Sequence, residues 1–133
     1  MKTLTMLLIA MVGLFALTGT PATYAQTEEK VYNEVDKSPE FPGGFSAMYA
    51  FMGKTIRYPE EASRKRIQGK VVTAFVVGED GTIRDIVIEK SAGYGMDEEA
   101  VRVIKAMPKW IPGERQGQKV AVYYKMPINF ALN

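Results

Sequence analysis

The sequence contains no histidine and no cysteine among its 133 residues. Without histidine the chain lacks the commonest general base and the commonest zinc ligand, and without cysteine it lacks a thiol nucleophile and any disulfide. Most hydrolase and metalloenzyme mechanisms are therefore excluded. We expect no enzyme, no cofactor, no metal and no small-molecule substrate, and a fold held together by packing alone.

The chain also lacks an excess of charge of one sign. It has 17 Lys and Arg residues against 15 Asp and Glu residues, and setting Lys2 aside leaves 16 against 15. Its densest basic cluster is Arg64, Lys65 and Arg66, which is more typical of a solvated helix end than of a binding patch. No nucleic acid or acidic lipid surface is expected as a partner.

The sequence has one long apolar run, at residues 4–17. Lys2 precedes it, and small residues follow as far as Ala25. A charged start, a short apolar stretch and a small-residue cleavage site are the pattern of a signal peptide. The run is shorter than the roughly 20 residues that span a bilayer. We expect residues 1–25 to be a cleaved signal peptide, and the alternative is a short anchor that stays uncleaved.

The remaining residues suffice for one small domain. Residues 26–40 are polar with few apolar side chains, which predicts a flexible linker. The turn signal Phe41-Pro42-Gly43-Gly44 follows. The domain is therefore expected at residues 41–133.

Three helices are predicted in this domain. The first begins at Phe45, because Phe45, Tyr49, Met52 and Ile56 fall on one helical face. The second is short: it starts at Pro59, with Glu60 and Glu61 in its first turn, and Gly69 ends it. The third has one apolar face, acidic residues 97–99 in its first turn and Pro108 as its stop. That face consists of Met96, Ala100, Val103, Ile104 and Met107.

Three strands are predicted as well. Residues 70–77 and 82–89 flank the turn at residues 78–81 and form a hairpin. Residues 70–77 are apolar on both faces, which is typical of a central strand. The last strand alternates, with an inward set of Val120, Val122, Tyr124, Met126, Ile128 and Phe130 and an outward set of Ala121, Tyr123, Lys125, Pro127 and Asn129. Pro127 cannot donate to a ladder, so this strand is expected at an edge.

These elements predict an α+β fold of two layers, a three-stranded antiparallel sheet packed against helices on one face. The acidic residues 60–61 and 97–99 sit at helix starts, where the helix dipole favours them, and they are poor candidates for acid–base catalysis. Trp110, in a loop between two prolines, is expected to pack over the end of the core rather than to serve as a recognition aromatic.

A series of short motifs follows along the domain: Tyr58-Pro59, Gly69-Lys70-Val71, Phe75-Val76-Val77, Asp80-Gly81, Glu99-Ala100-Val101, Trp110-Ile111-Pro112-Gly113, and the strand from Val120 through Pro127-Ile128-Asn129-Phe130. In order and spacing they resemble the C-terminal domain of the TonB family, over residues 41–132. Pro42-Gly43-Gly44 is similar to the variant common in Bacteroidetes-type members.

This resemblance implies a periplasmic module that binds TonB-dependent outer-membrane transporters. In the family, a short transporter segment, the TonB box, adds as an extra strand beside the last strand, in the service of energy-dependent transport of siderophores, cobalamin or glycans. An exposed strand edge suits such an addition, because its unpaired N–H and C=O groups can bond a partner's main chain. The partner-binding residues that the resemblance implies are Lys119, Val120, Ala121, Val122, Tyr123, Tyr124, Lys125, Met126, Pro127 and Asn129, with Arg57 and Tyr58.

The chain departs from an energy-transducing TonB in one respect. Such a protein keeps its anchor and has a long proline-rich segment, whereas about 15 residues between Ala25 and Phe41 reach only about 50 Å when extended. A contact with the inner-membrane, proton-driven motor proteins therefore requires the N-terminal run to stay uncleaved.

Self-association is the alternative to transporter binding. The expected outer face of the sheet is more apolar than a solvated sheet face, because it carries Val72, Ala74, Val76 and Tyr123. Such apolar patches mark interfaces. A periplasmic scaffold protein that forms a homodimer would use this face. The face could be covered by residues 26–40, by a second copy or by a partner.

Overall fold

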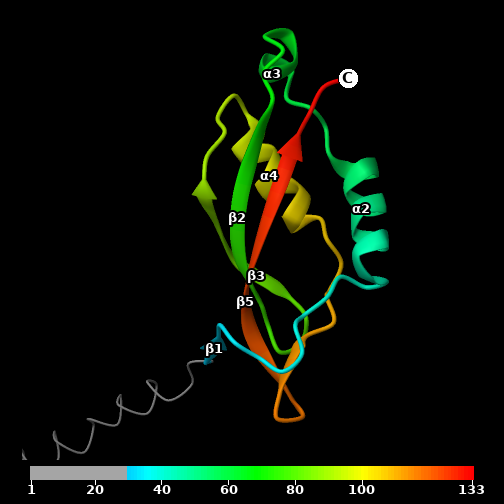
Figure 1. Ribbon diagram of the computed structural model, residues 1–133, viewed down its shortest axis with the longest axis vertical. Helices are drawn as coiled ribbons and strands as arrows, with labels where there is room; N and C mark the ends of the chain where they lie inside the picture. The colour runs from blue at the N-terminus through cyan, green and yellow to red at the C-terminus, as the bar shows by residue number, and fades with distance from the viewer. Residues whose placement is uncertain (1–29) are drawn as a thin grey trace, which may run out of the picture.

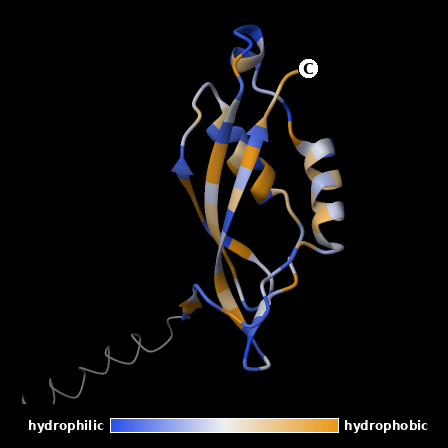
Figure 2. Cartoon of the chain, viewed as in Figure 1, coloured by the Kyte–Doolittle hydropathy of each residue, from blue (hydrophilic) through white to orange (hydrophobic). Residues whose placement is uncertain are grey.

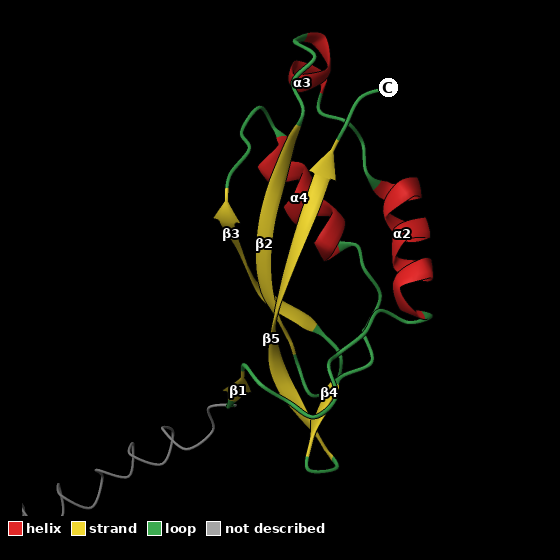
Figure 3. Cartoon of the chain, viewed as in Figure 1, coloured by secondary structure: helices red, strands yellow, loops and turns green. Residues whose placement is uncertain are grey.

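The computed structural model describes residues 30–133 and shows a twisted sheet with helices beside and behind it (Figure 1). The strands are β1 (Val31–Tyr32), β2 (Gly69–Val77), β3 (Ile83–Lys90), β4 (Gly113–Arg115) and β5 (Gln118–Phe130). The helices are α2 (Gly44–Thr55), α3 (Glu60–Arg64) and α4 (Met96–Lys105). The strand order is β1-β5-β2-β3, and β4 pairs with β5 (Figure 3). The predicted signal peptide lies outside the described residues.

The predicted hairpin and central strand are confirmed. β2 pairs antiparallel with β3 on one side and with β5 on the other, in an unbroken register from Gly69↔Phe130 to Val77↔Val122. The inward side chains of β2, which are Val71, Thr73, Phe75 and Val77, are at most 1% exposed. The predicted α+β class is therefore correct, with two short strands added to the expected three.

The turn between β2 and β3 holds the loop that carries Trp110. The Trp110 N–H donates to the Gly81 carbonyl oxygen at 2.9 Å. Gly81 has a φ of 88°, and a Cβ there would lie 2.0 Å from the Trp110 carbonyl oxygen. No other residue type fits this approach without a shift of the backbone. The turn thus fixes the tryptophan against the end of the core.

Helix α4 packs against β2 and β3 in the layer behind the sheet (Figure 1). Its buried residues are Met96, Ala100, Val103 and Ile104, as the apolar spacing predicted. Asp97 in its first turn accepts hydrogen bonds from the Ala92 N–H at 2.9 Å and from the Ser91 hydroxyl. This side chain ties the loop after β3 to the start of the helix, where a carboxylate is also favoured by the dipole.

The end of α3 differs from the prediction. The helix stops at Arg64, and Arg66 takes a φ of 55° while the Ile67 N–H bonds back to the Ala62 carbonyl oxygen at 2.8 Å. Such a left-handed residue with a long backward bond is a common helix terminator. Gly69, expected to end the helix, instead opens β2. The basic cluster does lie at the helix end.

Helix α2 exists where predicted, but its expected inward face is wrong in part. Phe45 and Tyr49 are each 67% exposed, and Met48 is the buried residue of the helix. The segment is apolar over more than one face, so the spacing alone could not decide which side turns inward. Packing around Phe41 decides it, because the Phe51 ring lies 5.6 Å from the Phe41 ring.

Residues 30–40, expected to belong to a flexible linker, instead pair with the sheet. β1 runs parallel to β5 through Val31↔Ala121 and Tyr32↔Val122. Two bridges follow, Lys37↔Glu114 and Glu40↔Ile111. Ala121, expected to face outward, is 1% exposed beside this segment. Figure 2 shows why composition missed it, since β1 is a single short hydrophobic stretch in a largely hydrophilic segment.

Candidate functional site

The first part of β5 is already paired with β4 and β1. Gln118, Lys119 and Val120 pair with β4, and Ala121 and Val122 pair with β1. The prediction of an edge strand therefore fails for the first part of β5. Of the expected partner-binding residues, Lys119, Val120, Ala121 and Val122 could accept another strand only if β1 and β4 moved.

The second part of β5 is the free edge. Within the described residues, 123–130 pair with β2 alone. Eight residues of strand extend about 26 Å at about 3.3 Å per residue. The remaining expected strand residues all lie on this stretch: Tyr123, Tyr124, Lys125, Met126, Pro127 and Asn129.

Two observations indicate which backbone groups point outward. The Thr73 hydroxyl donates to the Met126 carbonyl oxygen at 2.7 Å, so that carbonyl faces β2. Pro127, the next residue, has no N–H to offer β2 and is paired with Val72. Backbone direction alternates along an antiparallel strand. Lys125 and Asn129 therefore direct both their N–H and C=O groups to the free edge, and Tyr123 and Pro127 direct their carbonyls there, since the Tyr123 N–H faces β1.

Helix α2 runs beside this free edge (Figures 1 and 3). A cavity of about 420 Å³ lies between them, lined by Tyr49, Met52, Gly53, Ile56, Pro127 and Asn129. A smaller cavity of about 70 Å³ is lined by Pro39, Glu40, Phe41, Gly44, Phe45, Met48 and Tyr124. Residues of both α2 and β5 line each cavity. We call the two cavities together the α2–β5 groove.

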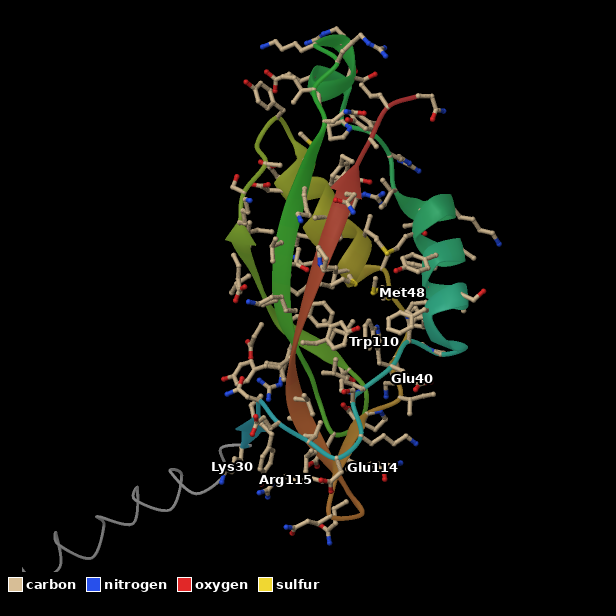
Figure 4. All side chains as sticks on the ribbon, viewed as in Figure 1. Lys30, Glu40, Met48, Trp110, Glu114 and Arg115 are labelled. Carbon is tan, nitrogen blue, oxygen red and sulfur yellow. The ribbon has the colours of Figure 1, made fainter. Side chains whose placement is uncertain are left out.

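Aromatic packing forms the inner support of the smaller cavity. The Trp110 ring lies 4.9 Å from that of Tyr124, 5.6 Å from that of Phe75 and 6.0 Å from that of Phe41. Figure 4 shows Trp110 between the sheet and Met48 of α2. Trp110 is 3% exposed, so the prediction that it packs over the core is confirmed. Burial, and then the nearby Tyr49, raise the pKa of Tyr124 above its ordinary value.

Arg57 and Tyr58, the two expected residues outside β5, lie just beyond the C-terminal end of α2. The Arg57 N–H donates to a Glu99 carboxylate oxygen at 2.6 Å, while the Arg57 side chain is exposed. The hydrogen bond from Arg102 to Glu99 is the main cause that holds the pKa of Glu99 below its usual range. The Tyr58 hydroxyl donates to the Ile67 carbonyl oxygen at 2.5 Å. Tyr58 is therefore engaged in the fold, and the exposed Arg57 follows Ile56, which lines the larger cavity.

The segment of residues 30–40 fixes the other end of the free edge. The Gln116 N–H donates to the Asp36 carboxylate at 2.6 Å, and the Lys37 N–H donates to the Glu114 carbonyl oxygen at 3.1 Å. The Arg115 guanidinium lies 4.9 Å from the centre of the Tyr32 ring. Figure 4 places Arg115 and Glu114 near the hairpin tip below this segment. These contacts hold β1 against β5 and end the free edge at Tyr123.

The exposed aromatic residues of α2 are the part of the site that sequence reasoning missed. Phe45 and Tyr49 stack with ring centres 6.5 Å apart. Their spacing predicted burial, but a second apolar set, Ala47, Met48 and Phe51, lies on another side of the same helix. A helix with two apolar faces can bury only one of them against the core. The second apolar face was therefore the signal in the sequence for an exposed apolar patch.

Within residues 30–133, no cluster of three or more acidic side chains is placed to hold a metal ion. No helix in this described part is long and apolar enough to cross a membrane.

Comparison with known proteins gives matches to one family. The family model for the Gram-negative bacterial TonB protein C-terminal matches residues 54–132. Two proteins named Protein TonB, from Xanthomonas campestris pv. campestris strains B100 and ATCC 33913, are each 32% identical over 78 residues, or 58% of this chain and 34% of theirs. The chain thus spans about a third of their length. The solution structure of the Helicobacter pylori TonB C-terminal domain matches with a TM-score of 0.51 and 27% identity, over 65% of this chain and 90% of that one.

Proposed function

Because the chain belongs to the family of Gram-negative bacterial TonB C-terminal domains, we propose that it is a periplasmic protein-binding module for TonB-dependent outer-membrane transporters. A transporter segment, the TonB box, adds as an extended strand to residues 123–130 of β5. The observation that carries the proposal is that this stretch pairs with β2 alone among the described residues. Its outward N–H and C=O groups are a template for one more strand.

The strength of such a contact can be bounded. The free edge offers two N–H and four C=O groups by the alternation described above. Six hydrogen bonds at roughly 0.5–1.5 kcal/mol each give roughly 3–9 kcal/mol. Association costs on the order of 4–15 kcal/mol in lost freedom of motion. The main-chain ladder alone therefore gives weak binding at best, and side chains of the partner have to contribute.

The proposed docking residues are a subset of those expected from the resemblance. Tyr123, Lys125, Pro127 and Asn129 meet the partner's main chain, and Tyr124 meets its side chains. Arg57 is retained as a contact at the end of the α2–β5 groove. The Met126 carbonyl oxygen accepts the Thr73 hydroxyl, so Met126 holds the edge strand against β2. Tyr58 is assigned to the fold, because its hydroxyl is already bonded.

The larger role proposed for the protein is a link in energy-dependent transport of siderophores, cobalamin or glycans. The motor proteins of the inner membrane are the partners that this role requires. In this proposal residues 1–25 direct export to the periplasm. The absence of histidine and cysteine supports a binding role over an enzymatic one.

A matched pair of variants tests the strand addition. Lys125→Pro removes one outward N–H from the middle of the free edge, and Lys125→Val removes the same side chain but keeps the N–H. Synthetic peptides from the N-terminal segments of outer-membrane transporters are titrated into each variant by calorimetry, after circular dichroism has checked that both fold. We expect Lys125→Val to bind and Lys125→Pro to lose at least about tenfold in affinity. Equal binding by both variants would refute strand addition at this edge.

A second candidate function, self-association, is favoured by the outer face of the sheet. Tyr123 is 52% exposed and Val87 is 53% exposed, and Val87 pairs with Ala74 on the neighbouring strand. At the β1 end, however, Val76 is 2% exposed, so the apolar face is smaller than the sequence suggested. Sedimentation velocity over a range of concentrations separates the two functions, because a homodimer would show a rising sedimentation coefficient.

A further inference from the structure

We propose that residues 30–41 are the place where tension enters the domain, and that they respond in two stages. Residues 30–36, the outer strap, detach from the sheet first and lengthen the chain, while residues 37–41, the inner lock, stay attached. This inference rests on the energy-coupling part of the proposed function, in which the chain before residue 30 is pulled from the inner membrane. It goes beyond that function, because it concerns how the load is carried inside the domain.

The outer strap is attached to the sheet by few contacts. Two of its residues, Val31 and Tyr32, pair with β5. The Lys30 Nζ and the Arg115 guanidinium lie 5.2 Å and 4.9 Å from the centre of the Tyr32 ring. Asp36 is bonded through its N–H to β4 and through its carboxylate to the turn after β4. A segment held by short pairing and by largely exposed side chains opens locally before the rest of the fold does.

The inner lock is attached more firmly. Lys37 and Glu114 exchange two backbone hydrogen bonds, at 3.1 and 2.9 Å. Glu40 and Ile111 exchange two more, at 3.0 and 2.8 Å. Phe41 follows directly, and its side chain is 6% exposed in the hydrophobic core. Because four backbone bonds and a core side chain have to be given up to free this segment, the inner lock holds after the outer strap has opened.

A glycine lets the inner lock lie this close to the sheet. A Cβ on Gly113 would lie 3.0 Å from the Lys37 carbonyl oxygen and 3.1 Å from the Pro39 Cδ. It would also lie 2.8 Å from the Val122 Cγ2 on β5. Any side chain at this position therefore displaces either the lock or β5. This attachment gives a physical reason for the glycine that ends the motif Trp110-Ile111-Pro112-Gly113.

From the inner lock the load passes into the sheet and not into helix α2. Ile111, which is bonded to the lock, follows Trp110, whose N–H donates to the Gly81 carbonyl oxygen in the turn between β2 and β3. Figure 4 shows Glu40 and Trp110 on this path, with α2 beside it. Helix α2 begins only after the lock, at residue 44. A pull on residue 30 therefore leaves the chain before it reaches the helix.

The outer strap stores a defined length of chain. Its seven residues span at most about 25 Å when extended. β1 runs parallel to β5, and the proposed docking stretch at residues 123–130 continues along the same strand. A pull on residue 30 against a partner held there acts along β5 and strains the two residue pairs of β1. Release of the strap supplies about half of the roughly 50 Å that the segment between Ala25 and Phe41 reaches when extended.

Stretching single molecules of the full chain in optical tweezers tests this inference. The chain has no cysteine, so Gln26→Cys and Asn129→Cys provide two unique attachment points. We expect a first gain in contour length of up to about 25 Å and then, at higher force, a gain of roughly 300 Å as the remainder unfolds. One single step would overturn the two stages. A first step of about 40 Å, which is the length of residues 30–40, would do the same.

A matched pair of tyrosine variants locates the first stage. Tyr32→Ser removes the ring between Lys30 and Arg115, and we expect the equilibrium constant for opening the strap at a given force to rise roughly five- to thirtyfold. Tyr49→Ser removes a 67% exposed ring on α2, outside the load path, and should leave both steps unchanged. An unchanged first step in Tyr32→Ser, or a changed one in Tyr49→Ser, would refute the proposed load path.

A third variant tests the lock, after circular dichroism has checked that it folds. Gly113→Ala is expected to lengthen the first step to about 40 Å, because the lock then leaves together with the strap. A first step that stays at about 25 Å would contradict the role of Gly113. No transporter segment is present in these experiments, so a negative result leaves strand addition standing. Equal binding by Lys125→Val and Lys125→Pro would conversely leave the two stages standing.

Discussion

The two parts of strand β5 differ in how their backbone is used. The first part, up to Val122, is paired with β4 and β1. The second part, from Tyr123 onward, has β2 as its partner within the described residues and a helix standing beside it. Open edges invite unwanted pairing, and proteins usually cover or interrupt them. Here one part is closed by main-chain pairing, while the other is left open but bounded by α2 and by Pro127, which is the arrangement expected of an edge that must accept a specific strand.

The largest effect is expected from moving a proline by one position along the open part. Met126→Pro removes a backbone group that faces β2, whereas Lys125→Pro removes one that faces outward. Relative to Met126→Ala and Lys125→Val as controls, we expect the proline to lower the free energy of unfolding by roughly 3 kcal/mol at 126 and by less than about 1 kcal/mol at 125. Urea unfolding measures both differences. Equal losses at the two positions would mean that the assigned backbone directions are wrong.

The attachment of α2 should depend on its buried side chain, Met48, and not on its exposed aromatic pair. Met48 is 5% exposed, so Met48→Ala is expected to lower the free energy of unfolding by about 2 kcal/mol. Phe45→Ser and Tyr49→Ser should each change it by less than about 0.5 kcal/mol without a partner, because these side chains are mostly exposed. Thermal unfolding of the three variants tests the contrast. A large loss at Phe45 or Tyr49 would show that the pair serves the fold rather than binding.

Weakening the contact of β1 with the closed part of β5 should lower the free energy of unfolding by less than Met48→Ala does. Asp36→Ala removes the acceptor of the Gln116 N–H, and we expect a loss of about 1 kcal/mol together with faster hydrogen exchange in the Ala121 amide, which faces β1. Asp36→Asn keeps an acceptor oxygen and is expected to lie between the wild type and Asp36→Ala. Exchange is followed by two-dimensional NMR. Unchanged exchange at Ala121 in Asp36→Ala would show that this contact does not hold β1 in place.

The smallest expected effect is on the pH dependence of the free energy of unfolding, through Glu99, which accepts the Arg57 N–H. Arg102 lowers the pKa of Glu99 in the folded chain. The ionised Glu99 therefore stabilises the fold at pH values above its pKa in the unfolded chain, and this stabilisation is lost as pH falls through its pKa in the folded chain. Glu99→Gln should therefore flatten the acid side of the stability profile, below about pH 4.5. Denaturant unfolding between pH 3 and pH 7 measures the slope. An identical slope in wild type and variant would exclude Glu99 as its source.

The sequence predicted the parts of the fold that have one clear periodicity. The hairpin forms at the predicted turn, and the central strand and α4 bury residues that their spacing assigns. The prediction of the inward face of α2 was wrong in part, because the helix has more than one apolar side. Only packing against Phe41 selects among these sides. β1 was missed because two residues carry no period and its partner lies about 90 positions away.

The candidate site was predicted to a similar degree. Pro127 correctly indicated an edge, since a missing N–H is a local property that the sequence shows directly. The end of that edge at Tyr123 could not be predicted, because it depends on where residues 30–40 fold back. The groove depends on the same kind of long-range packing, in which α2 is set beside β5 rather than over the sheet.

Amide hydrogen exchange along β5, with and without a bound transporter segment, tests the central claim most directly. In the free chain we expect fast exchange at Lys125 and Asn129, and slow exchange at Tyr124, Met126 and Ile128, whose N–H groups face β2. The bound segment should slow the first set and leave the second unchanged. Slow exchange at Lys125 and Asn129 in the free chain, or no added protection on binding, would contradict an open edge that accepts a strand.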